Sequence, residues 1–177
     1  MDILATFSDE TLNISDETQQ GEASPAPTAR EAARGIIMDE NDKIVLLYTE
    51  KHGHHKLPGG GIDPEDVSWK DAFKREAKEE AGCTIFVSSV TVGKTVEQRT
   101  SWNMVQTSYC GIGHVLSKGK PELTESEVEQ GFQPPKWVTL DEAVKLFEAD
   151  KPKTYLSHFM HTRDMLLLKE AIKVLKD

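Results

Sequence analysis

The sequence has few cysteines, no long apolar run and fewer basic than acidic residues. Many cysteines, a long apolar run and an excess of basic residues are the features that a disulfide-rich protein, a membrane-spanning protein and a nucleic-acid-binding protein, respectively, require. Only two cysteines, Cys83 and Cys110, occur in 177 residues, so no disulfide framework is predicted and a reduced, cytoplasmic location is expected. We find no signal peptide and no apolar run long enough to cross a membrane. Lysine and arginine total 21 against 30 acidic residues, and the net charge of −9 argues against a broad surface for a nucleic-acid polymer or a membrane.

The length favours one domain, preceded by a segment of different composition. Residues 1–29 form a polar N-terminal extension, in which 4–7 are predicted to add a short strand and 8–28 are acidic and polar. This extension is either flexible or an arm that packs on its own domain or on the second subunit of a homodimer. Residues 30–177 are expected to form the domain itself.

A loop followed by one charged helix, over residues 57–83, organises the rest of the chain. Gly59, Gly60 and Gly61 permit close approach of backbone to a ligand and can offer a carbonyl to a metal. The helix that follows ends at Gly82 and carries a set of glutamates near its end: Glu76, Glu79 and Glu80.

These glutamates occupy positions i, i+3 and i+4, so their carboxylates share an arc of roughly 100° on one helix face. Like charges at this spacing repel each other, and a hard divalent cation with oxygen ligands would remove the repulsion. An apolar stripe beside them indicates that the helix is packed: Trp69, Phe73, Ala77 and Ala81. The alternative is a solvated helix with ordinary Glu–Lys pairs. The glycine loop that precedes the helix favours a binding site over this alternative.

The stretch resembles the signature of the Nudix hydrolase superfamily, in which a glycine and a spaced glutamate precede Arg-Glu-x-x-Glu-Glu-x-Gly. The residues that carry this resemblance are Gly60, Arg75, Glu76, Glu79, Glu80, Gly82 and Cys83. The resemblance implies Mg²⁺ or Mn²⁺ held by Glu76, Glu79, Glu80 and the Gly59 carbonyl, with Arg75 orienting a carboxylate. One residue is inserted before Arg75, so Asp66 or Glu65 must supply the first acidic group of the signature.

Strand patterns lie on both sides of this stretch. We predict a hairpin over 33–38 and 43–49, strands over 85–92, 94–99, 103–116 and 136–138, and helices over 140–149 and 154–177. The elements alone indicate α/β or α+β, and the resemblance, over 33–147, implies an α/β/α sandwich with a mixed sheet.

Other candidate site residues lie outside the helix. Lys56 and Gly60 are expected to meet the substrate, as are Glu97 and Arg99, for which cross-strand surface pairing is the alternative. The long polar loop 117–135 offers Glu127 and Glu129 as an additional metal-binding or water-activating carboxylate.

Three histidines precede the glycine loop. His52, His54 and His55 suggest zinc, but no Cys or His cluster elsewhere completes a tetrahedral set, so we interpret them as an exposed turn in which His55 can meet the substrate.

The resulting hypothesis is metal-dependent hydrolysis of a pyrophosphate linkage in a nucleoside diphosphate joined to a group X. Glu76, Glu79, Arg75 and Glu127 would be catalytic, and Glu76 or Glu127 would accept the proton of the attacking water. The alternatives are a nucleotide-binding module without activity and an isomerase built on the same fold.

Overall fold

The computed structural model describes residues 1–14 and 23–176. The strands are β1 Ile3–Ser8, β2 Thr28–Met38, β3 Ile44–Thr49, β4 His54–Lys56, β5 Gly59–Gly61, β6 Cys83–Arg99, β7 Met104–Lys118 and β8 Lys136–Val138. The helices are α1 Trp69–Ala81, α2 Glu125–Glu129, α3 Leu140–Ala149 and α4 Tyr155–Val174, with a 3₁₀ turn at Thr100–Trp102. None of the helices described is long and apolar enough to cross a membrane.

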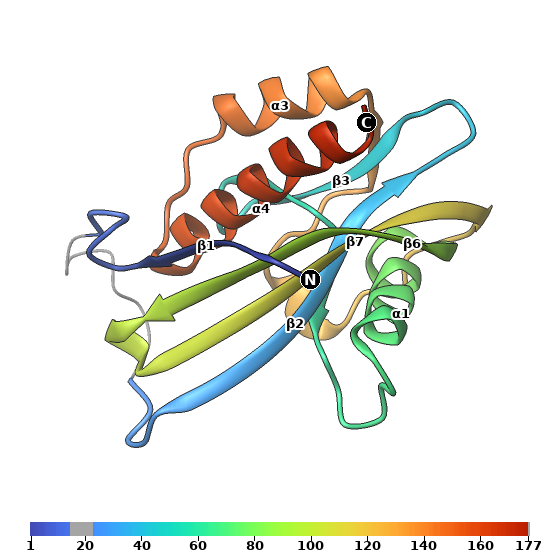
Figure 1. Cartoon of the computed structure of the whole chain (residues 1–177). Helices are drawn as coiled ribbons and strands as arrows, with labels where there is room; N and C mark the ends of the chain where they lie inside the picture. The colour runs from blue at the N-terminus through green and yellow to red at the C-terminus, as the bar shows by residue number, and fades with distance from the viewer. Residues whose placement is uncertain (15–22, 177) are drawn as a thin grey trace.

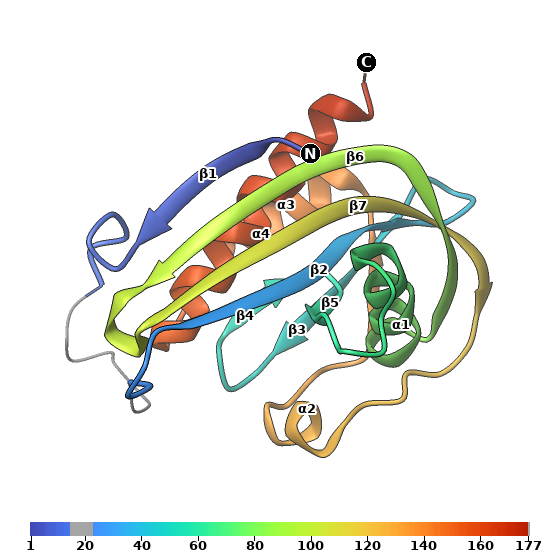
Figure 2. The ribbon, with the colours of Figure 1, turned by 60° about the horizontal axis from the view of Figure 1, so that its bottom comes forward.

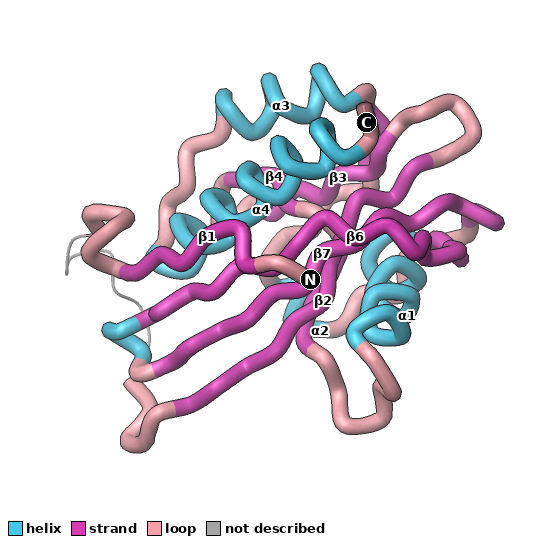
Figure 3. Tube along the Cα trace, in the orientation of Figure 1, coloured by secondary structure: helices cyan, strands magenta, loops and turns pink. Residues whose placement is uncertain are grey.

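The described strands form one mixed sheet in the order β1-β6-β7-β2-β3-β4, with β5 paired to β2 and β8 paired to β3 (Figure 3). β1 runs parallel to β6 and β2 runs parallel to β7, whereas the other pairs are antiparallel. The strands predicted over 85–92 and 94–99 are one continuous strand, β6, whose register shifts near Thr91 and Gly93.

Helices cover both faces of the sheet, with α1 on one side and α3 and α4 on the other (Figures 1 and 2). Alternate residues of β2 account for the two layers, because successive strand side chains point to opposite faces. Ala33 and Ile37 pack in the core under α1, whereas Ile36 and Met38 pack in the core under α3 and α4. The predicted α/β/α sandwich with a mixed sheet is confirmed.

The helix that carries the acidic group ends where the sequence predicts, at Gly82, and it begins at Trp69. Ser68 caps the first turn of α1 by accepting a hydrogen bond from Asp71 N, and Gly82 follows the last residue in the left-handed conformation that favours glycine. The preceding glycines, expected as a loop, instead form the short strand β5, whose backbone pairs with Ala32–Arg34 of β2. This pairing fixes the glycine segment to the sheet beside α1.

The first residues of the chain belong to the sheet rather than to a separate unit. β1 confirms the strand predicted over 4–7, and Phe7 is buried against Phe159 of α4. Beyond β1, Asp9 accepts hydrogen bonds from the Tyr155 hydroxyl at 2.7 Å and from Ser101 N at 2.9 Å. The described part of the extension is therefore an arm packed on its own domain. Residues 15–22 of the predicted polar segment lie outside the described residues, and the domain boundary at residue 29 stays a prediction.

Candidate active site

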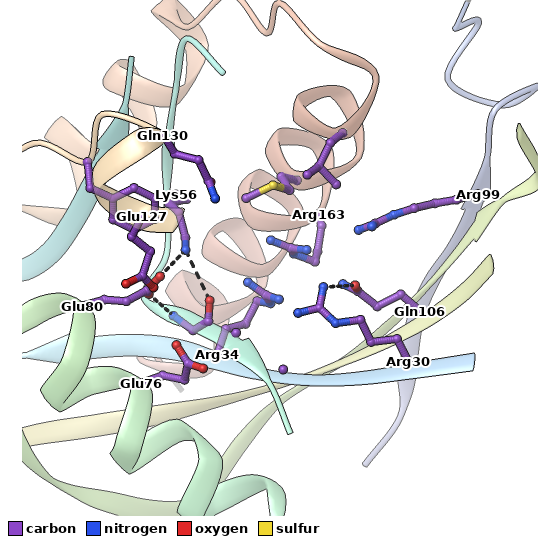
Figure 4. A pocket seen from close by; sticks show the side chains of 16 residues that line it. Arg30, Arg34, Lys56, Glu76, Glu80, Arg99, Gln106, Glu127, Gln130 and Arg163 are labelled. Atoms are coloured by element: carbon purple, nitrogen blue, oxygen red, sulfur yellow. Dashed lines mark hydrogen bonds and ion pairs between the residues drawn. The ribbon is translucent and has the colours of Figure 1, made fainter. Parts of the chain in front are cut away.

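A cavity of about 250 Å³ opens between the glycine strand, α1, α2 and α4 (Figure 4). Its two ends have opposite charge: carboxylates of α1 and α2 gather at one end, and arginines of β2, β6 and α4 gather at the other. The charged and amide side chains that line it are Arg30, Arg34, Lys56, Glu76, Glu80, Arg99, Gln106, Glu127, Gln130 and Arg163.

Three carboxylates meet at the acidic end. Glu76 and Glu80 lie one turn apart on α1, and Glu127 reaches them from α2. Each offers an oxygen, and these oxygens all lie within 4.8 Å of one another. In the described part of the chain no other group of His, Cys, Asp or Glu side chains has this metal-ligating geometry.

Burial and mutual repulsion disfavour the ionised forms of Glu76 and Glu80, even though Arg75 and Lys56 contact them. Burial, with a further contribution from the neighbouring Glu80 carboxylate, raises the pKa of Glu76 to about 7, against the opposing effect of Arg75. Burial also raises the pKa of Glu80 above its usual range, against the opposing effect of Lys56. Buried oxygen donors that repel one another are the ligand set that a hard divalent cation prefers, so the residues present fit Mg²⁺ or Mn²⁺.

Lys56 supplies the only described cation in direct contact with Glu80. Its Nζ lies 2.5 Å from Glu80 Oε1 and donates a second, longer hydrogen bond of 3.3 Å to the Gly59 carbonyl. The Gly59 amide in turn donates to Glu80 Oε2 at 2.7 Å. Lys56 thus lies in the cavity, as expected of a substrate-binding residue, but it is paired with a carboxylate there.

Two glycines make the close packing of β5 possible. Gly59 has φ of 145°, and a Cβ there would lie 2.3 Å from the Ala33 carbonyl oxygen. A Cβ at Gly60 would lie 2.4 Å from Glu76 Oε1. Any side chain at these positions would push the strand away from the sheet or from the acidic group, so glycine is required for the geometry of the site.

Arg75 contacts several of the carboxylates near the glycine strand and orients them. Its guanidinium donates to Glu76 Oε1 at 2.9 Å, to Glu79 Oε2 at 3.0 Å and to Asp66 Oδ2 at 2.9 Å. The acidic residue that takes the first place of the signature beside Arg75 is therefore Asp66, whereas Glu65 is exposed. Glu79, expected as a metal ligand, is turned toward Arg75 and lies outside the group formed by Glu76, Glu80 and Glu127.

The polar loop contributes one of its two candidate glutamates. Glu127 lies on the short helix α2, where its side chain also caps Thr124 N at 2.7 Å. Glu129 lies on the same helix but lines a second cavity with Trp102 and Tyr155. The loop expectation missed α2, although the Thr-x-x-Glu spacing from Thr124 to Glu127 is the capping-box pattern that marks a helix start.

Glu97 and Arg99 are not a surface pair, which was the alternative considered for them. Glu97 is fully buried beneath the cavity and binds Arg99 through Nε at 2.9 Å and Arg163 through Nη1 at 3.0 Å. Arg99 lines the cavity, whereas Glu97 does not.

Arg163 was considered for the mouth of the cleft, and it lines the cavity; the sequence analysis missed Arg30, Arg34 and the Asp164 carboxylate beside Arg34. They lie far apart in the sequence within strand and helix patterns that also suit structural residues, so only the register of the fold brings them together.

The histidines before the glycine strand do not form the exposed turn that was expected. His52 and His54 are buried, and His54 Nδ1 lies 2.8 Å from the His55 carbonyl oxygen. His55 Nδ1 lies 2.8 Å from Asp150 Oδ1, and His55 is absent from the residues that line the cavity. The structure gives these side chains packing contacts in place of a role at the site.

Comparison with known proteins agrees with the fold and the site. Residues 28–159 match the NUDIX domain family, so the chain belongs to the Nudix family, and the enzyme class that this membership defines is the Nudix-type pyrophosphohydrolase. No curated protein matches the sequence.

Solved structures share the fold at low sequence identity. A NUDIX hydrolase from Nitrosomonas europaea superposes with a TM-score of 0.61 at 18% identity, over 82% of this chain and 89% of that one. The NUDIX domain of Shewanella oneidensis NrtR, complexed with ADP ribose, gives 0.59 at 14%, over 92% and 94%. An Ap4A hydrolase from C. elegans gives 0.58 at 19%, over 83% and 98%.

Proposed function

We propose that the protein hydrolyses a pyrophosphate linkage in a nucleoside diphosphate derivative, using Mg²⁺ or Mn²⁺. The observation that carries the proposal is the group of carboxylate oxygens within 4.8 Å at one end of a cavity whose other end is lined by arginines. One end suits a divalent cation and the other suits a phosphate, which are the two components of such a substrate complex.

Glu76, Glu80 and Glu127 are the residues that would hold the cation, and the Gly59 carbonyl and Glu79 remain additional candidates from the family resemblance. When bound there, a divalent cation withdraws charge from phosphoryl oxygens and lowers the pKa of a coordinated water. Arg75 and the Gly59 amide keep the carboxylates in place, because both donate hydrogen bonds to them.

The reaction forms a bond between a water oxygen and phosphorus and breaks the bond from that phosphorus to the bridging oxygen. Glu76 or Glu127 accepts the proton of the attacking water. The bridging oxygen leaves with its electron pair on the departing phosphate.

The substrate class rests on the nucleotide-type ligands of the structural neighbours, one of which was solved with ADP ribose and another of which is an Ap4A hydrolase. We propose the same general class here, namely a nucleotide whose diphosphate carries a second group X. The domain of residues 30–177 would carry the site, with the N-terminal arm packed beside α4.

A panel of substrates tests this function against its rivals. Dinucleoside polyphosphates, nucleotide sugars, ADP-ribose and oxidised nucleoside triphosphates are incubated with the protein in Mg²⁺ or in EDTA, and the products are separated by chromatography. We expect cleavage of at least one diphosphate in Mg²⁺ and none in EDTA, with strong loss in Glu80→Gln. Binding without cleavage would indicate the non-catalytic module, and a rearranged product with an intact diphosphate would indicate the isomerase.

A further inference from the structure

The arginine end of the cavity carries more positive charge than the protein neutralises. We call Arg30, Arg34, Arg99 and Arg163 the arginine wall. The carboxylates in contact with it within the described residues are Glu97, bound to Arg99 and Arg163, and Asp164, bound to Arg163. Four guanidinium groups against two carboxylates leave two positive charges beside the cavity.

Arg30 and Arg34 account for this excess. Arg30 donates to the neutral amide oxygen of Gln106 at 3.2 Å. Arg34 Nη1 lies 3.9 Å from Asp164 Oδ1, a carboxylate that already accepts a hydrogen bond from Arg163 Nε at 2.7 Å. Neither arginine therefore has a carboxylate of its own in the part of the chain that the structure describes.

Two donors of the wall are buried and unpaired. Arg34 is 3% exposed and Arg163 is 1% exposed, and in the described residues neither Arg34 Nε nor Arg163 Nη2 has a hydrogen-bond partner. Both residues line the cavity, and Figure 4 shows their guanidinium groups directed into it. A buried donor without a partner costs stability, so a guanidinium group that turns toward an acceptor in the cavity would recover that free energy.

The lowered pKa of Arg34 agrees with the lack of an anionic partner of its own. Burial, together with the positive charge of Arg163, lowers the pKa of its guanidinium to about 10, against the weaker opposing effects of Asp164, Glu97 and Glu80. The charged form of Arg34 is thus disfavoured until an anion lies beside it.

We propose that the arginine wall binds a terminal phosphate on the group X of the substrate, so that the preferred substrates carry a phosphate monoester in addition to the diphosphate that is cleaved. This inference rests on the proposed function and names the chemistry of X.

The amount of charge and the number of donors distinguish a terminal phosphate from a phosphate within the chain. A bridging phosphate offers two free oxygens and a single negative charge, whereas a terminal phosphate offers three acceptor oxygens and a charge of about −1.5 to −2 at neutral pH. The wall has two uncompensated positive charges and donors from three elements, β2, β6 and α4. Planar guanidinium groups match phosphate oxygens in pairs, which favours phosphate over a carboxylate of smaller charge.

Binding of inorganic phosphate to metal-free protein tests the wall by itself. Calorimetric titration in EDTA is expected to show a single phosphate bound per chain. Arg34→Gln and Arg30→Gln each remove a charge-assisted hydrogen bond of about 1.5–3 kcal/mol, so the affinity should fall about 10- to 100-fold. Arg34→Lys keeps the positive charge but loses the paired N–H donors of the guanidinium. Its phosphate affinity should therefore lie between that of the unmodified protein and that of Arg34→Gln.

Two control variants accompany this titration. Lys145→Gln removes an exposed positive charge on α3, far from the wall, and Glu80→Gln changes the metal end. Both are expected to bind phosphate in EDTA no more weakly than the unmodified protein. Phosphate binding that is absent from the unmodified protein, or equally strong in Arg34→Gln, would overturn the inference.

A matched pair of substrates tests the consequence for specificity. ADP-ribose and ADP-ribose with a phosphate on its anomeric hydroxyl differ in that terminal phosphate alone. The unmodified protein should favour the phosphorylated compound by about tenfold or more in kcat/KM, and Arg34→Gln should lose that preference while Lys145→Gln keeps it. Equal rates for the two compounds would contradict the inference. If neither compound is cleaved, the substrate panel decides the proposed function and the titration in EDTA decides this inference.

Discussion

The ammonium group of Lys56 lies 2.5 Å from a carboxylate oxygen of Glu80, and both side chains are almost completely buried. This pair neutralises one charge of the acidic group. Glu76 shares the Arg75 guanidinium with Glu79 and Asp66, and Glu127 has no ion-pair partner among the described residues. Three carboxylates and one ammonium carry a net charge of −2, the amount that one divalent cation balances. Lys56 therefore reduces the negative charge that a bound metal ion has to neutralise.

Replacing Lys56 by Met should destabilise the metal-free protein. The change leaves a buried, unpaired carboxylate at Glu80, and breaking a buried pair in this way costs about 3–5 kcal/mol. Urea denaturation in EDTA measures the loss, and Mg²⁺ should reduce it because a cation then lies beside Glu80. Lys145→Met, at an exposed position, is the control. Equal unfolding free energies for the two variants would show that the pair contributes nothing.

Glu76 should make the metal-free protein less stable as pH rises. Its pKa in the folded state is about 7, against 4.5 for the ordinary side chain, so between these values the folded protein holds a proton that the unfolded chain has released. Stability from this group is complete below pH 4.5, is lost as pH rises to about 7, and the loss amounts to about 3 kcal/mol.

The measurement is the difference between the unmodified protein and Glu76→Gln, each unfolded by urea in EDTA across this pH range. A difference is needed because the pKa of His54 is lowered by burial to about 4, which makes stability rise with pH in an overlapping range. The His54 contribution is common to both proteins and cancels. A pH-independent difference between them would contradict the assignment of the raised pKa to Glu76.

Asp66 should matter for catalysis and Glu65 should not. Asp66 Oδ2 accepts a hydrogen bond from the Arg75 guanidinium at 2.9 Å. Asp66→Asn therefore weakens the contact that positions Arg75, which in turn orients Glu76 and Glu79. We expect kcat to fall about tenfold with little change in KM, since Asp66 is not among the residues that line the cavity. Glu65→Gln at the neighbouring exposed position is the matched control. Similar losses in both variants would mean that Arg75 does not depend on Asp66.

The N-terminal arm should contribute to the stability of the domain. Phe7 is 6% exposed and stacks on Phe159 with ring centroids 6.0 Å apart. Phe7→Ala should cost about 3 kcal/mol, as is usual for deletion of a buried aromatic ring. Ile3→Ala, at a position that is 57% exposed on the same strand, should cost far less. A Phe7 variant as stable as the Ile3 variant would show that the arm is dispensable.

The parts of the molecule that the sequence predicts are those governed by local pattern. The bounds of α1 follow from the apolar stripe ending at Ala81 and from Gly82, and α3 follows from the Thr139–Glu142 capping box. Glu76 and Glu80 were predicted to share a helix edge because helical spacing alone decides that. Helical spacing could not show that Glu79 lies outside the metal-binding group, because the orientation of its side chain depends on its hydrogen bond from Arg75.

The arginine wall could not be predicted in this way, because no local pattern joins its members. Arg34 enters the site because β5 pairs with β2 at Gly59, and Arg163 enters because α4 covers the same face of the sheet. Glu97 also illustrates the limit. Its alternation on β6 suits a surface strand, but the sheet places α4 over it and buries it completely.

The most direct test of the account is a calorimetric titration of Mg²⁺ into the unmodified protein and into Glu76→Gln, Glu80→Gln, Glu127→Gln and Glu129→Gln. The first three substitutions each remove a carboxylate of the buried group, and the affinity should fall at least about tenfold in each. Glu129→Gln, on the same helix as Glu127 but facing another cavity, should bind Mg²⁺ like the unmodified protein. Unchanged affinity in all four variants would contradict the central claim that Glu76, Glu80 and Glu127 hold a divalent cation.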